Sequence, residues 1–252
     1  MVSADSDQNR SRADVVVEHG RISAVVDAGT APTAGATVID ARDRLLMPGL
    51  VNAHTHSPTN VLKGTGDRLS HPAFMWRNQA DTAGRTPDEI RLSALLGIEH
   101  LLGGTTAVID HFPEQGFCQA DVDAVVDAYR MTGMRAMVAL RIFDEAYTDI
   151  EPPDGYPPGF ATDNPLSPPP LDQTVALVEA SIKRHNGSAD GRIRICPAPS
   201  NPMRCSDHLL SAVVGIAELT TPQYTCICWK PRFRPASPKS AMDEAWCNTL
   251  IH

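Results

Sequence analysis

The chain has 252 residues, of which 42% are hydrophobic and 21% are charged, and its formal net charge is −8. This composition is typical of a globular protein with enough length for a sizeable core. The acidic balance argues against nucleic acid or an anionic membrane as the main partner, because both attract basic surfaces, and it favours a small-molecule substrate.

The first 49 residues read as a small β-module. Met1–Asp14 is polar and lacks the apolar core of a secretory signal, and no later apolar run approaches the length of a membrane span. We therefore predict a cytoplasmic location. Residues 14–27 alternate apolar and polar positions around Gly20, which predicts a β-hairpin, and residues 36–49 predict further short strands.

From Leu50 onward, strand-like apolar runs alternate with segments of helical character. This alternation is typical of βα units around a parallel sheet, so we predict an α/β fold. The predicted strands are 50–57, 105–112, 135–143 and 192–200, and the predicted helices are 87–102, 119–132 and 171–184.

Local signals fix some of these boundaries. Thr86 is an expected N-cap before Pro87, and Gly103-Gly104 is expected to end that helix. Residues 151–170 are too rich in Pro and Gly for regular structure and too long for an ordinary connector. They are either a lid or active-site loop, or a surface excursion without a role.

His54 and His56 stand at the end of the first predicted strand. Side chains two residues apart in a strand project to the same side, so both imidazoles can bind one metal ion. The spacing alone leaves open that they are ordinary surface or core histidines.

The context of this pair resembles the amidohydrolase superfamily. The segment "DARDRLLMPGLVNAHTHSP" is similar to the strand that leads into the first barrel strand and its two metal-binding histidines, and "GGTTAVIDH" is similar to the second barrel strand. "CPAPSNPMRCSDHLL" resembles the fourth-strand segment of the branch with triazine chlorohydrolases, S-adenosylhomocysteine deaminase, guanine deaminase and cytosine-deaminase-like enzymes.

The resemblance implies part of a (β/α)8 TIM barrel together with part of a β-sandwich. Residues 1–49 would belong to the sandwich, residues 50–219 would form the first half of the barrel, and residues 220–252 would belong to neither. It also implies one divalent ion, Zn2+ or Fe2+, bound by His54 and His56. The reaction would be hydrolysis of a non-peptide C–N bond, or of a C–Cl bond, on a purine, pyrimidine or triazine-like ring by metal-bound hydroxide.

Several polar or aromatic residues are candidates for substrate binding. Asp110 and His111 end the second strand and are expected to face the same mouth, although Asp110 could instead cap a loop and His111 could face solvent. Ser200 and Asn201 follow the fourth strand, where the family commonly places a polar substrate contact; the alternative is a rigid loop. Trp76 matches a position that walls the pocket in this branch, or it is a core aromatic residue.

The tail departs from the family pattern, which continues with His-x-His-x-x-Glu and then another His and a metal-binding Asp. The residues from Leu219 to Lys230 contain no acidic residue or histidine. However, back-translation of Tyr224–Pro231, read from the third base of each codon, admits His-Met-His-Leu-Leu-Glu-Thr. We therefore expect a frameshift near Thr220.

Three functional alternatives follow from these observations. The first is a metal-dependent deaminase or chlorohydrolase that acts on a small heterocycle. The second is a truncated, catalytically inactive product of such a gene, which the missing His, Glu and Asp of the second half favour for this chain as written. The third is a two-metal relative of the dihydroorotase or urease type, which ranks last because no lysine follows a barrel strand suitably in 50–219. The sequence leaves the oligomeric state open.

Overall fold

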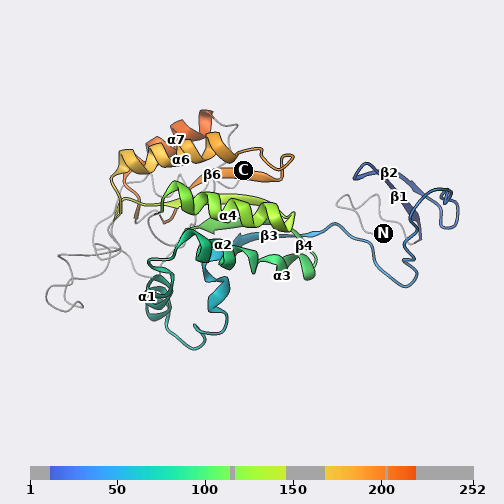
Figure 1. The fold of residues 1–252 in the computed structure, drawn as a ribbon, viewed down its shortest axis with the longest axis horizontal. Helices are drawn as coiled ribbons and strands as arrows, with labels where there is room; N and C mark the ends of the chain where they lie inside the picture. Colours follow the sequence, from blue (N-terminus) through green and yellow to red (C-terminus); the bar gives the residue numbers. More distant parts are fainter. Residues whose placement is uncertain (1–11, 114–116, 146–167, 202–203, 220–252) are drawn as a thin grey trace. The chain divides into compact units, whose positions relative to one another are not determined.

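The computed structural model describes residues 12–113, 117–145, 168–201 and 204–219 (Figure 1). Most of the Pro-rich segment 151–170 and all of the tail 220–252 lie outside these ranges, as do the expectations attached to them. The chain forms two compact units, Met1–Leu50 and Val51–His252. Within the described ranges, no helix combines the length and the hydropathy needed to cross a membrane.

The first unit contains the predicted hairpin. Strands β1 (Asp14–Glu18) and β2 (Arg21–Val26) pair antiparallel, and His19 and Gly20 adopt the positive φ angles of 51° and 73° that a tight turn requires. The short strands predicted in 36–49 are wrong: this segment carries no strand, and Ile39 is 83% exposed. An alternating segment becomes a strand only where a partner strand satisfies its backbone, and the described residues offer none here.

The second unit is built on a four-stranded sheet in the order β3-β4-β5-β6. The strands are β3 (Leu50–Thr55), β4 (Thr105–Phe112), β5 (Arg135–Ile142) and β6 (Ile193–Pro199). The pairs β4–β5 and β5–β6 are parallel, with His111 opposite Ala139 and Ala139 opposite Cys196. The predicted α/β class with a parallel sheet is therefore confirmed.

The connections between these strands are helical. They comprise η2 (Ser57–Leu62), α1 (His71–Thr82), α2 (Pro87–Leu95), α3 (Ile98–Leu102), α4 (Gln119–Thr132), α6 (Leu171–His185) and, after β6, α7 (Asp207–Leu219). Thr86 caps α2 in a capping box with Glu89, as predicted. The helix predicted over 87–102 is split at Gly97, whose N–H donates to the Ala94 carbonyl in a tightened turn. A Cβ at Gly97 would lie only 2.9 Å from that oxygen.

The two faces of the sheet differ in their side chains. On one face, alternate strand residues such as Val138, Leu140 and Ile142 form a continuous core with α2, α4, α6 and α7. The opposite face carries the residues between them, including the buried Ala139, Cys196 and Ala198. The helix-packed face therefore holds most of the buried apolar residues. The opposite face buries small side chains, with Ile109 and Met137 partly buried against them.

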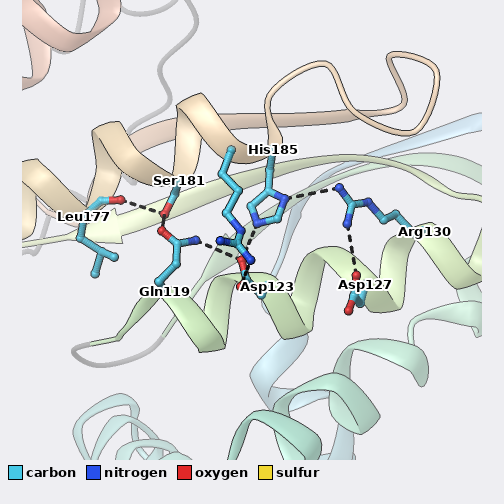
Figure 2. A network of polar contacts seen from close by, with 8 residues as sticks. Gln119, Asp123, Asp127, Arg130, Leu177, Ser181 and His185 are labelled. Atoms are coloured by element: carbon cyan, nitrogen blue, oxygen red, sulfur yellow. Dashed lines mark hydrogen bonds and ion pairs between the residues drawn. The ribbon is translucent and has the colours of Figure 1, made fainter.

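A polar network joins α4 to α6 on the helical side of the sheet (Figure 2). Asp123 accepts hydrogen bonds from His185 Nε2 at 2.6 Å and from Gln119 at 3.1 Å, and it forms an ion pair with Arg184 at 2.8 Å. Arg130 lies 3.4 Å from His185 Nδ1. Because a guanidinium can only donate, this contact favours the His185 tautomer with its proton on Nε2.

Candidate metal centre and substrate site

The two histidines of the predicted metal site converge. His54 lies near the end of β3 and His56 directly after it, and their Nε2 atoms are 3.1 Å apart. Two nitrogen ligands at about 2.0–2.1 Å from one tetrahedral zinc ion would be about 3.3 Å apart. His54 is exposed and His56 half-buried, so an ion can reach the pair from solvent. The pair therefore fits two neighbouring positions of one metal site.

Two imidazoles are fewer than the three protein ligands typical of a catalytic zinc site. Among the residues that the structure describes, no group of three or more His, Cys, Asp and Glu side chains is arranged to hold a metal ion. The described part of the chain thus offers two candidate metal ligands, His54 and His56.

His111 joins the pair at the end of β4. Its ring centroid lies 4.5 Å from that of His54 and 5.7 Å from that of His56. His111 is 2% exposed, so the alternative of a solvent-facing histidine is wrong. The contact with His54 also shows that β3 and β4 end at the same edge of the sheet, which is the edge where α/β proteins place their active sites.

Asp110 does not face the same side as His111, contrary to the expectation from sequence. It alternates with His111 along β4 and points into the layer between sheet and helices, where it is fully buried. Its carboxylate accepts hydrogen bonds from Ser57 N–H at 2.8 Å and from Tyr129 OH at 2.9 Å. The alternative interpretation, an aspartate that caps a loop, describes its contacts better.

Burial and hydrogen bonding act in opposite directions on this carboxyl group. Burial raises the pKa of Asp110, and the bonds from Ser57 and Tyr129 and the nearby His56 oppose that shift without cancelling it. Burial, followed by the charge of Asp110, raises the pKa of Tyr129 well above its ordinary value. Tyr129 is thereby kept as a hydrogen-bond donor to Asp110.

Ser200 lies at the carboxyl end of β6, where it meets a residue that the sequence analysis missed. Ser200 is 2% exposed, and its Oγ accepts a hydrogen bond of 2.8 Å from Nε of Arg141, which is 6% exposed. Arg141 is the penultimate residue of β5 and lies on the same face as Ala139. The signal that could have revealed it is that Arg141 is the one charged residue in the otherwise apolar run 136–143.

The other two predicted substrate residues are half-buried. Trp76 lies on α1, and Asn201 follows Ser200, with its carbonyl accepting a hydrogen bond from Arg204 N–H at 2.8 Å. Their roles in a substrate pocket stay predictions. The structure thus brings together His54, His56 and His111 at the carboxyl ends of β3 and β4. It also brings Arg141 and Ser200 together at the carboxyl ends of β5 and β6.

Sequence relatives of the chain include deaminases. The chain is 30% identical over 217 residues to a 5'-deoxyadenosine deaminase of Methanothermobacter thermautotrophicus, covering 82% of this chain and 42% of the relative. It is 32% identical over 210 residues to a 5-methylthioadenosine/S-adenosylhomocysteine deaminase of Haloarcula marismortui. This match covers 81% of this chain and 41% of the relative. The chain thus spans about two fifths of the length of these curated relatives.

Solved structures with a similar fold include a mutant atrazine chlorohydrolase of Arthrobacter aurescens complexed with zinc and atraton. It has a TM-score of 0.72 and 21% identity, and the match covers 90% of this chain and 51% of that one. An adenosine deaminase of Xanthomonas campestris with bound zinc has a TM-score of 0.57 and 26% identity. The match covers 85% of this chain and 44% of that one. The model of the amidohydrolase family matches residues 45–219, and the chain belongs to this family.

Proposed function

We propose that this chain carries the first metal ligands of an amidohydrolase that hydrolyses a C–N or C–Cl bond on a purine, pyrimidine or triazine-like ring. The observation that carries the proposal is the convergence of His54 and His56 Nε2 atoms at 3.1 Å beside His111 at a strand edge. Family membership and the deaminase relatives support the reaction class.

In this proposal residues 1–49 belong to a β-sandwich, and β3 to β6 are the first four strands of a (β/α)8 barrel. The neutral imidazoles of His54 and His56 suit Zn2+, and they also accept Fe2+. The chemistry that zinc supplies when bound is activation of water, because it lowers the pKa of bound water to about 7.

The other strand-end residues would bind and orient the substrate. His111 offers a ring nitrogen, and Arg141 and Ser200 offer hydrogen-bonding groups that are already held in place by their mutual contact. Trp76 and Asn201 complete the proposed set as a pocket wall and a polar contact. Orientation of a ring carbon toward the metal site is how such residues contribute to rate.

The activity test uses the full chain with Zn2+ and ring substrates of both classes: 5'-deoxyadenosine and S-adenosylhomocysteine for ammonia release, and a chlorotriazine for chloride release. An active chain would release ammonia or chloride from at least one substrate above the background of a His54→Ala/His56→Ala double variant. Equal release from the two proteins would contradict an active enzyme.

The second candidate is a catalytically inactive product of an amidohydrolase gene. It is favoured by the absence of a three-ligand group among the described residues and by the shifted-frame peptide that back-translation of residues 224–231 admits. We propose that the tail is read out of frame from about Thr220. Nucleotide sequencing tests this directly: codons that do not give His-Met-His-Leu-Leu-Glu-Thr in the shifted frame would contradict it.

A further inference from the structure

Asp110 occupies an unusual place for a carboxylate. It is fully buried on the helix-packed side of β4, where its neighbours in alternation, Val108 and Phe112, belong to the apolar core. Burial of a charged group is costly unless hydrogen bonds compensate, and apolar residues often fill such places at no loss of stability. The position therefore points to a role other than packing.

The hydrogen bonds of Asp110 lead to the metal site. Its Oδ1 accepts from the N–H of Ser57, the residue directly after His56, at 2.8 Å. Its Oδ2 accepts from the hydroxyl of Tyr129 on α4, which is itself 3% exposed, at 2.9 Å. One carboxylate thus joins β4 and α4 to the first residue of the turn that follows the two histidines.

The same turn is held from α2 as well. Ser93 is fully buried, and its Oγ lies 2.7 Å from the Ser57 carbonyl and 3.2 Å from the Pro58 carbonyl. Asn60 Nδ2 donates in return to the Ser93 carbonyl at 3.0 Å. Ser57 is therefore fixed through both its N–H and its carbonyl, which leaves the backbone beside His56 little freedom.

We propose that Asp110 is a positioning residue for the metal pair, which it serves by holding Ser57 N–H and so fixing the backbone that aims His56 Nε2 at His54 Nε2. Tyr129 orients the carboxylate, and Ser93 holds the other side of the turn. As far as the metal is concerned, this inference rests on the proposed function. Outer-sphere partners of this kind typically change metal affinity by about 10–100-fold when they are removed.

The test compares Asp110→Leu, Asp110→Asn and Tyr129→Phe in the full chain. Asp110→Leu removes both acceptors, whereas Asp110→Asn retains an acceptor for Ser57. Tyr129→Phe removes only the orienting hydroxyl and keeps the test valid if Asp110→Leu does not fold. Asp123→Asn is the matched control, because this carboxylate binds His185 and Arg184 and not the turn.

Two readouts are measured: amide hydrogen exchange of residues 56–62 in the metal-free chain, and Co2+ affinity from visible absorption. Asp110→Leu is expected to raise exchange at least tenfold and to weaken Co2+ binding about 10–100-fold. Tyr129→Phe should also raise exchange and weaken Co2+ binding, but less than Asp110→Leu does. Asp110→Asn should stay close to wild type in both readouts. Asp123→Asn should lower the melting temperature and leave both readouts unchanged.

The inference would be overturned if Asp110→Leu showed the same amide exchange and the same Co2+ affinity as wild type. Equal changes in Asp110→Leu and Asp110→Asn would also overturn it. If the wild-type chain itself binds no Co2+, the proposed function fails. In that case the exchange data still decide whether Asp110 holds the turn.

Discussion

The two faces of the β4–β6 sheet are built for different purposes. The helix-packed face carries Leu140 and other large aliphatic residues in one continuous core with four helices. The opposite face carries small residues such as Ala139 and Ala198, and then His111 and Arg141 at the strand ends. Close apolar packing stabilises the first face, whereas the second gathers basic and hydroxyl groups at one edge. The large apolar residues and most candidate site residues therefore lie on different faces, and Asp110 is the exception on the helix-packed face.

The largest expected effect is on the helix-packed face. Leu140→Ala leaves a cavity at a fully buried position and should lower the free energy of unfolding by about 2–5 kcal/mol. Denaturant unfolding measures this change, with Leu102→Ala as the control. Leu102 is 84% exposed, so its truncation should change stability by less than about 0.5 kcal/mol. Similar losses in the two variants would contradict the assignment of Leu140 to the core.

A smaller loss is expected on the opposite face from Ser200→Ala. This change removes the hydroxyl that accepts from Arg141 Nε inside the protein, and a hydrogen bond to a buried charged group contributes about 1.5–3 kcal/mol. Ser211→Ala, on the exposed side of α7, is the matched control in the same unfolding experiment and should be nearly neutral. Wild-type stability in Ser200→Thr would support a stabilising role for the hydroxyl, and wild-type stability in Ser200→Ala would contradict it.

The smallest effect is expected in the α4–α6 network, and it depends on pH. Partial burial acts to raise the pKa of Asp123, but the hydrogen bonds from His185 and Gln119 and the charge of Arg184 outweigh it, so the pKa lies below its ordinary value. Asp123→Asn should therefore cost about 1 kcal/mol at pH 5. Because the folded-state pKa is lowered, this contribution is present above the unfolded pKa of about 3.9 and is lost as the pH falls through the folded value.

Urea unfolding of wild type and Asp123→Asn between pH 5 and pH 3 measures this difference. The gap between the two proteins should narrow on acidification. Asp127→Asn on the same helix is the control, because its exposed ion pair with Arg130 contributes only about 0.3–0.5 kcal/mol. A gap that widens toward pH 3 would show that the network does not stabilise the ionised carboxylate.

The sequence predicts those parts of the site that depend on neighbouring residues, and it does not predict those that depend on contacts between distant segments. The spacing of His54 and His56 at a strand end fixes their common side locally, so the pair could be predicted. Strand alternation alone puts Asp110 and His111 on opposite faces of β4. Which of the two faces the helices could not be predicted, because it depends on tertiary packing. The same reasoning explains the fold: α4 begins and ends at the predicted residues Gln119 and Thr132, where local signals suffice. The strands predicted in 36–49 are wrong, because a strand also needs a partner strand, which the local pattern does not specify.

The most direct test of the account is divalent metal binding by the His54–His56 pair. Co2+ titration of the full chain, followed by visible absorption and by competition with Zn2+, compares wild type with His54→Ala and His56→Ala, and uses His208→Ala on the exposed side of α7 as the control. We predict saturable Co2+ binding at one site in wild type. The affinity should fall at least 100-fold in His54→Ala and in His56→Ala, and it should be unchanged in His208→Ala. Equal affinity in all four proteins, or none in wild type, would contradict it.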